Sequence, residues 1–247
     1  MANYYKTKVQ TTDSLIKYWV YSKPITYDYE SKRQNYEKAK EGNKRQDSLN
    51  RSRSKMIDLI DANVNYYSKF ITLTLNEKYS QLARDEFLKK FKQFQKNFKR
   101  KFNKALAYVG VLEKQFKRQK KYNLKQAPWH IHLIVFISQK LDFKILKKCW
   151  PYGSVDIKKV DYQGNLSIYL AKYLTKDNIK LNKKAFLSSR NLKKPNVITT
   201  TEVIIPNNPT YEKSYLGFQN GKKDLDHVME IKYYEFRKTK TKKSNTV

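Results

Sequence analysis

Residues 129–137 read Trp-His-Ile-His-Leu-Ile-Val-Phe-Ile, and this run predicts a β-strand. Its β-branched and aromatic side chains favour an extended backbone. Successive side chains of a strand point to opposite faces, so His130 and His132 share one face and lie about 7 Å apart along the chain. Two imidazoles placed in this way can chelate one divalent ion, although two half-buried histidines on an ordinary sheet would give the same pattern.

The sequence around this strand predicts an alternation of strands and helices. In residues 84–106 phenylalanines recur every three or four positions, which is typical of an amphipathic helix. The expected order is strand–helix–strand–strand–helix–strand–helix, over residues 70–75, 84–106, 107–116, 129–137, 141–150, 155–160 and 166–176. This is the split βαβ order, so we expect an α+β fold with a central antiparallel sheet and flanking helices on one face.

The chain outside this core has a different composition. Residues 1–54 are polar and end in a basic stretch, so we expect a mobile or partly helical basic N-terminal arm. The catalytic domain is expected to span residues 55–206, beginning with a short helix over residues 56–64. Residues 207–247 would form a C-terminal extension with a basic tail.

The charge of the whole chain points to a polyanionic partner. Its 247 residues include 53 Lys and Arg but only 22 Asp and Glu, which gives a formal net charge of +31. Such a field attracts nucleic acid by counterion release. No apolar run is long enough for a transmembrane helix, and no phosphate-binding P-loop occurs, so any duplex unwinding must come from another protein. Cys149 is the single cysteine, which fits a reducing cytoplasm and leaves no membrane partner expected.

Glu113 is a candidate third ligand beside the histidine pair. It interrupts the apolar run of residues 109–112 on the strand expected before residues 129–137. Burying a carboxylate is unfavourable unless it is paired or bound to a metal, although a strand end at the solvent edge would also accommodate it. Two imidazoles and one carboxylate with open coordination positions suit Mg²⁺ or Mn²⁺ acting on a phosphate.

Residues 166–176 carry the candidate nucleophiles. At helical spacing Tyr169 and Tyr173 lie on one face, followed by Lys172 and Lys176. A phenol can attack phosphorus to form a covalent phosphotyrosine, and a neighbouring ammonium group favours phenolate and neutralises the phosphate. In a chain this rich in Tyr and Lys, an ordinary amphipathic helix could carry the same pattern, but its position after the histidine strand favours catalysis.

At these residues the sequence resembles the HUH endonucleases, which are named for two histidines around a bulky hydrophobic residue. Residues 130–132 match that motif, residues 70–75 resemble the FxTLT-type strand, and residues 169–176 are similar to the Tyr-x-x-Lys-Tyr motif. More narrowly, the chain resembles the replication-associated proteins of filamentous phages and small rolling-circle plasmids. This resemblance runs from about residue 57 to 197, and its stretch between Glu113 and Pro128 is longer and more basic than the hairpin of the family.

The resemblance implies a palm-like sheet and a nicking–joining reaction on single-stranded origin DNA. Mg²⁺ or Mn²⁺ would be held by Glu113, His130 and His132. Tyr169 or Tyr173 would attack one phosphodiester, keep the 5′-phosphate and leave a free 3′-OH for a host polymerase, with a host helicase as a further partner in the bacterial cytoplasm. The second tyrosine could then cut the regenerated origin.

Two other functions are compatible with parts of this pattern. An HUH transposase or relaxase would use the same chemistry, but common relaxases place the nucleophile near the N-terminus and carry three clustered histidines. A non-catalytic RNA-binding domain on a similar sheet would display aromatic side chains on its central strands, and it gives the histidine pair no role. We therefore expect a rolling-circle replication initiator.

Overall fold

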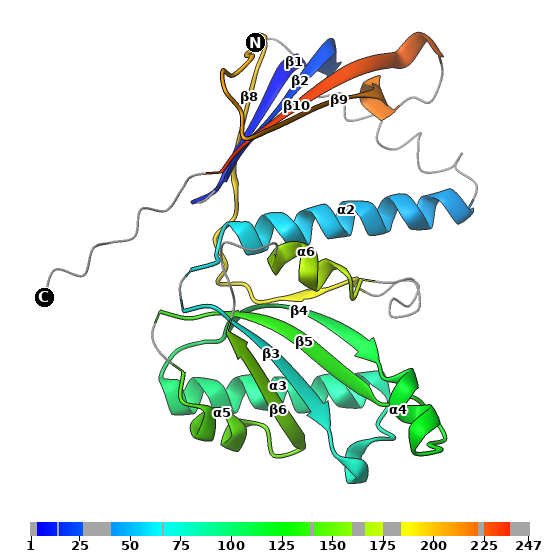
Figure 1. Cartoon of the computed structure of the whole chain (residues 1–247), viewed down its shortest axis with the longest axis vertical. Coiled ribbons are helices and arrows are strands. Elements are labelled where there is room, and N and C mark those ends of the chain that lie inside the picture. Colours follow the sequence, from blue (N-terminus) through cyan, green and yellow to red (C-terminus); the bar gives the residue numbers. More distant parts are fainter. Residues whose placement is uncertain are drawn as a thin grey trace, which may run out of the picture. The chain divides into compact units, whose positions relative to one another are not determined.

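The computed structural model describes residues 4–13, 15–26, 41–65, 67–138, 141–159, 166–174, 184–221 and 225–237. The chain divides into two compact units. Ser48–Lys193 form the central unit, and Met1–Asp47 together with Lys194–Val247 form the terminal unit. Each contains one five-stranded sheet within the described residues (Figure 1).

The central unit contains the predicted split βαβ sheet. Its strands are β3 (Lys69–Leu75), β4 (Ala107–Lys114), β5 (Trp129–Phe136), β6 (Gly153–Lys159) and β7 (Leu187–Ser188). They lie in the order β6-β3-β5-β4-β7, and every pairing is antiparallel. Because β5 lies between β3 and β4, the βαβ unit that those two strands form with the intervening helix is split as expected.

Helices cover both faces of this sheet, which corrects the expectation of helices on one face (Figure 1). The helical elements are α2 (Glu41–Asp61), η1 (Glu77–Tyr79), α3 (Arg84–Phe102), α4 (Phe116–Lys121), α5 (Phe143–Cys149) and α6 (Leu166–Ala171). α3 and α5 pack on one face, whereas α2 and α6 pack on the other. The sequence of α2 conceals this role, because basic and polar side chains surround its apolar positions Met56 and Ile60.

The α3 face of the sheet holds the larger core. Phe87, Phe91, Phe94 and Phe98 are buried there, as the phenylalanine spacing predicted. The helix ends at Phe102 rather than at residue 106, because Asn103 adopts the left-handed conformation (φ 49°) that commonly terminates helices.

The α6 face holds a second core cluster. Leu170 and Leu174 are fully buried against Met56, Ile60 and Phe70, so two of the three predicted leucines of this stripe are confirmed. α6 is shorter than expected: after Ala171 the chain continues as a tighter turn, in which the Tyr173 N–H donates to the Leu170 carbonyl. Lys176 lies outside the described residues.

The terminal unit corrects the expected division of the chain. Residues 4–26 are not an arm but two strands, and the C-terminal extension completes their sheet. Its strands are β1 (Tyr4–Thr11), β2 (Leu15–Thr26), β8 (Asn196–Thr200), β9 (Tyr211–Phe218) and β10 (Val228–Arg237), in the antiparallel order β8-β1-β2-β10-β9, with η2 (Gln219–Gly221) and η3 (Leu225–His227) in the β9–β10 connection. The partner strands of β1 and β2 lie at the far end of the sequence, which local pattern does not reveal. The expected boundaries at residues 54 and 206 therefore fall at 47 and 193 instead.

No helix among the described residues is long and apolar enough to cross a membrane.

Candidate active site

The pairing of β4 with β5 brings the three predicted metal ligands together. Their register sets Glu113 directly opposite His130, on the sheet face that His132 shares. His130 Nε2 lies 2.6 Å from Glu113 Oε2, and His132 Nε2 lies 2.8 Å from the same oxygen. The candidate donor atoms all lie within 4.8 Å of one another. The cluster predicted from sequence is therefore a single site.

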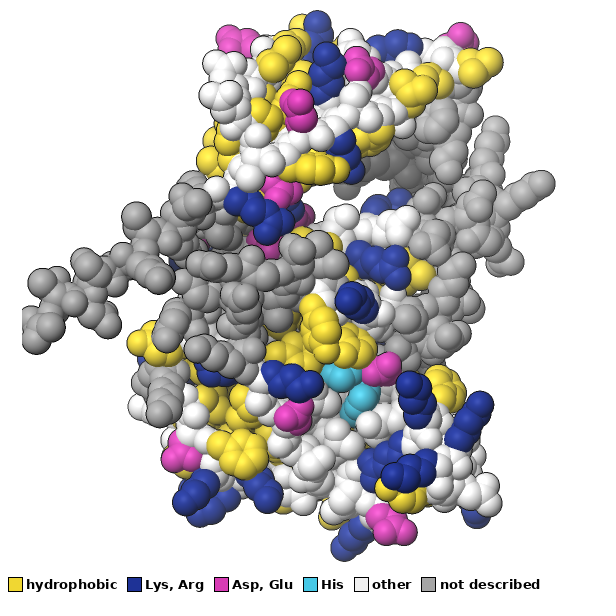
Figure 2. All heavy atoms as spheres, in the orientation of Figure 1, with side chains coloured by type: hydrophobic (Ala, Val, Ile, Leu, Met, Phe, Trp, Pro, Cys, Tyr) yellow, Lys and Arg dark blue, Asp and Glu magenta, His cyan; other side chains and the backbone are white. Residues whose placement is uncertain are grey.

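The donor set fits one divalent ion. Ligand bonds of about 2.1 Å allow donor atoms about 3–4 Å apart to share an ion. Both histidines are buried (8% and 6% exposed), and the Nδ1 of His130 is buried with no hydrogen-bond partner among the described residues. Figure 2 shows histidine side chains opening onto the surface beside acidic and hydrophobic ones, with Lys and Arg side chains around them. A phosphate could therefore reach this cluster.

The protonation states of the cluster also suit a cation. Partial burial opposes ionisation of Glu113, but the hydrogen bonds with His130 and His132 outweigh burial and lower the pKa of its carboxyl to about 2. Burial lowers the pKa of His132, and the charges of His130 and Lys158 lower it further. A carboxylate and a neutral imidazole are the forms that bind metal ions.

Thr72 on β3 supports the cluster from the neighbouring strand. It pairs with His132 across the sheet, and its Oγ1 lies 3.1 Å from His132 Nδ1. When Nδ1 donates its proton to this hydroxyl, Nε2 carries the lone pair that can bind a metal. Sequence reasoning placed Thr72 on the correct face but missed this role, whose only signal is the alternation of threonines beside the histidine strand.

The tyrosines of the α6 segment lie directly over this cluster. The Tyr173 ring stacks on the His132 ring, with centroids 3.8 Å apart. The Tyr173 hydroxyl donates to the Tyr169 hydroxyl at 3.2 Å, and Phe70 packs against Tyr169 with centroids 5.2 Å apart. Burial raises the pKa of Tyr173, and its hydrogen bond to Tyr169 and the charge of Glu113 raise it further. Both phenols therefore face the cluster from one helix.

Cations surround the two phenols. The Nζ of Lys172 lies over the Tyr169 ring, 5.6 Å from its centroid. Arg53 of α2 donates to the Leu174 carbonyl at 2.7 Å and so fixes the end of the segment that carries both tyrosines. The connection that follows Glu113 includes α4, where Arg118 donates to the Leu75 carbonyl at the end of β3. This connection contains Lys117, Lys120, Lys121 and Lys125.

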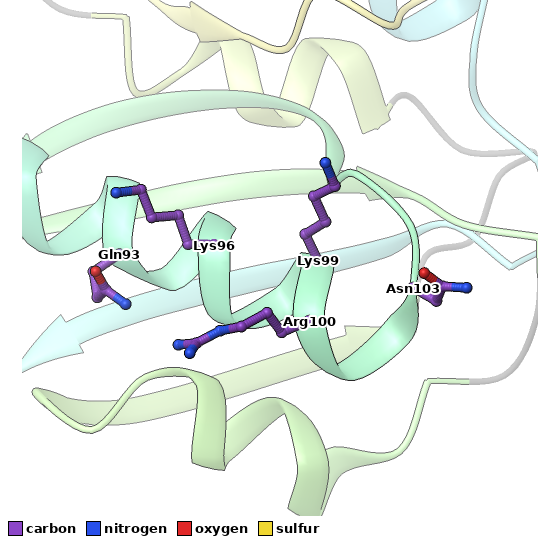
Figure 3. Close-up of a pocket in the computed structure, with 5 residues that line it drawn as sticks. All are labelled: Gln93, Lys96, Lys99, Arg100 and Asn103. Carbon is purple, nitrogen blue, oxygen red and sulfur yellow. The ribbon is translucent and has the colours of Figure 1, made fainter.

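A separate surface hollow lies away from these residues. It measures about 590 Å³ and is lined by Gln93, Lys96, Lys99, Arg100 and Asn103 (Figure 3). These residues belong to α3 and its C-terminal cap, which cover the sheet face opposite the histidines. The hollow therefore does not contribute to the candidate active site.

The comparisons with known proteins agree with this location. Residues 68–178 match the family model described as replication-associated protein ORF2. The match covers less than half of the chain and contains β3 through α6, with Glu113, His130, His132 and both tyrosines. It supports a role in the initiation of replication, and with it DNA binding. No curated protein and no solved structure matches the chain significantly.

Proposed function

We propose that the protein is a metal-dependent enzyme that nicks and rejoins single-stranded origin DNA to initiate rolling-circle replication. The observation that carries this proposal is the meeting of two elements: the Glu113–His130–His132 cluster on the sheet, and the Tyr169–Tyr173 pair stacked over it. The match to replication-associated proteins supports the biological role, and HUH endonuclease chemistry on a palm-like sheet is the form that this arrangement suggests.

The reaction would begin with attack of a phenol oxygen on the scissile phosphorus. The oxygen–phosphorus bond forms, the bond from phosphorus to the 3′ oxygen breaks, and the 3′ oxygen leaves as a hydroxyl, which balances the proton lost by the phenol. A divalent ion held by Glu113, His130 and His132, which we expect to be Mg²⁺ or Mn²⁺, would supply Lewis-acid polarisation of the phosphate. The 5′-phosphate stays on tyrosine, so the reverse attack by a 3′-hydroxyl rejoins DNA without another energy source.

The residues of the chain have distinct parts in this scheme. Lys172 lies beside the Tyr169 ring, where its charge favours the phenolate and the developing phosphate charge. We propose a similar part for Lys176. Because the two hydroxyls are 3.2 Å apart, either phenol can reach nearly the same position in the site. This supports a cycle in which one tyrosine holds the displaced strand while the other cuts the regenerated origin.

A covalent-adduct assay tests the proposal. The protein is incubated with a labelled single-stranded oligonucleotide from its origin region and Mn²⁺, and denaturing electrophoresis reports label that stays with the protein. We expect an adduct that EDTA prevents and that the Tyr169→Phe/Tyr173→Phe double variant does not form. Adduct formation in that double variant would refute the nucleophile assignment, and cleavage that survives His130→Ala/His132→Ala would refute the metal site.

An HUH transposase or relaxase would give the same adduct, so the match to replication-associated proteins is what favours replication. A non-catalytic RNA-binding domain would instead bind RNA tightly and cleave nothing with any metal.

A further inference from the structure

The sheet of the terminal unit carries a row of cationic and aromatic side chains that the proposed reaction does not use. Cross-strand pairing aligns Lys8, Trp19, Tyr233 and Lys213 on one face of the sheet, from β1 through β2 and β10 to β9. Residues directly opposite each other in antiparallel strands share a face, and strands lie about 4.8 Å apart. We call these four residues the aromatic row.

The side chains of this row are in contact with one another. Lys8 Nζ lies 4.8 Å from the Trp19 ring centroid, the Trp19 and Tyr233 rings are 5.3 Å apart, and Lys213 Nζ lies 5.5 Å from the Tyr233 ring. The order is therefore cation, ring, ring, cation. Cation–π contacts hold each ammonium group over an aromatic face and leave its remaining hydrogens able to bind an anion.

Two further tyrosines of β9 extend this face at the edge of the sheet. Tyr211 pairs with Glu235 and Tyr215 with Ile231, so both share the face of Tyr233. They are 53% and 39% exposed. The Tyr211 ring lies 6.3 Å from the Tyr233 ring, and Lys213 Nζ lies 5.1 Å from the Tyr215 ring. The exposed part of the surface is therefore two phenol rings on either side of a lysine.

The one acidic side chain in this register is already engaged. Glu235 accepts hydrogen bonds from the Tyr233 hydroxyl at 2.8 Å and from Arg237 Nε at 3.0 Å. The opposite face is covered near Thr7, whose hydroxyl donates to the Glu202 carbonyl and accepts from the Ile204 N–H. Among the described residues, the two faces of the sheet thus differ: one is covered by its own chain, and the other presents rings and ammonium groups.

We infer that this face is a second nucleic-acid site, which binds single-stranded DNA by stacking its bases on Trp19, Tyr211, Tyr215 and Tyr233 while Lys8 and Lys213 contact phosphates. Unpaired bases stack on aromatic side chains whatever their sequence, and lysines follow the backbone. Duplex DNA hides its base faces and cannot bind in this way. The choice of DNA over RNA rests on the proposed function, because nicking at an origin releases a single strand that must be held near the enzyme.

Tryptophan fluorescence of the full chain tests this site, because Trp129 and Trp150 are buried (4% and 1% exposed) and Trp19 is the partly exposed tryptophan. The protein carries Tyr169→Phe/Tyr173→Phe so that no DNA is cut, and the probe is oligo(dT) in low salt. We expect oligo(dT) to quench the fluorescence, the Trp19→Phe variant to lose that quenching, and Tyr211→Ala/Tyr215→Ala to weaken binding at least tenfold.

Leu216→Ala is the matched control, since Leu216 is 74% exposed on the other face of the same strand. It should bind as the parent does. Equal weakening by Leu216→Ala, unchanged binding in Tyr211→Ala/Tyr215→Ala, tighter binding of duplex DNA, or tighter binding of oligo(U) would each overturn the inference. If the Tyr211 and Tyr215 variant weakens binding but the chain with both active-site tyrosines forms no adduct, the proposed function fails and this inference stands.

Discussion

The Tyr173 ring lies on the His132 ring, with centroids 3.8 Å apart and an interplanar angle of 29°. This contact joins the helix that carries the candidate nucleophiles to the strand that carries the candidate metal ligands. It makes the tyrosine a support for the imidazole as well as a source of a phenol. These two contributions can be separated by substitution.

Tyr173→Leu should weaken Mn²⁺ binding about tenfold, whereas Tyr173→Phe should leave it unchanged. Phenylalanine keeps the ring that orients His132 and loses only the hydroxyl, whereas leucine keeps a hydrophobic side chain but loses the stack. Groups that orient a metal ligand are typically worth about 10–100-fold in affinity. Isothermal titration with Mn²⁺ gives the comparison, and an equal loss in both variants would show that the ring has no orienting role.

Thr72→Val should reduce Mn²⁺ affinity by about 10–100-fold without unfolding the protein, because it removes the hydroxyl 3.1 Å from His132 Nδ1. Thr74→Val is the control: Thr74 lies on the same face of β3, opposite His130. The two variants are compared by metal titration, with circular dichroism to confirm folding. Should both behave like the parent, the Thr72 hydroxyl does not orient the histidine.

Arg53→Met should lower the free energy of unfolding by about 1.5–3 kcal/mol and slow adduct formation. It removes a charged donor from the Leu174 carbonyl, and with it the tie between α2 and the end of the tyrosine segment. Arg51→Met, at an exposed position of the same helix, should change neither quantity. Urea unfolding and the adduct assay measure the two effects. If Arg53→Met loses stability but keeps the parent rate, the tie is structural only.

Gly153→Ala should destabilise the central unit by about 1–3 kcal/mol or more. A Cβ at this position would collide with the Thr74 carbonyl oxygen and the Asn76 backbone nitrogen, and backbone atoms of two paired strands cannot easily move aside. Ser154→Ala, at the next and exposed position, is the control. Thermal unfolding followed by circular dichroism should show a clear decrease in Tm for Gly153→Ala alone. An unchanged Tm would mean that β6 can shift away from β3.

Local pattern was sufficient to predict the split βαβ core. Hydrophobic periodicity changes clearly between residues 70–75 and the phenylalanine helix that follows, and Asp142 caps α5 by accepting from the Lys144 and Ile145 N–H groups. The histidine pair shares a face simply because it lies on a strand. For these elements the local preferences agree with the final fold.

The sheet of the terminal unit was not predictable in the same way. β1 and β2 contain Lys, Gln and Thr at positions that the sheet half-buries, so their composition resembles that of a solvated arm. Their outer partners, β8 and β10, come from the other end of the sequence. Pairing across such a distance is a tertiary effect, and single-sequence patterns do not contain it.

The position of Glu113 illustrates a further limit. The long connection to Pro128 left the register of β4 against β5 open, and a shift of one residue would have moved Glu113 to the other face. In the structure, α4 occupies this connection and the Gln115 N–H donates to the Pro128 carbonyl at 2.9 Å. This closed end fixes the Glu113–His130 pair, which no spacing rule would have given.

Mapping the covalent linkage tests the central claim most directly. After reaction with single-stranded origin DNA and Mn²⁺, the adduct is digested with nuclease and protease and sequenced by mass spectrometry, with oligonucleotides labelled at either end. We predict a nucleotide joined through its 5′-phosphate to Tyr169 or Tyr173, label retained only from the 3′ side of the nick, and a free 3′-OH on the released strand. A linkage through a 3′-phosphate, or to a residue other than these two tyrosines, would contradict the account.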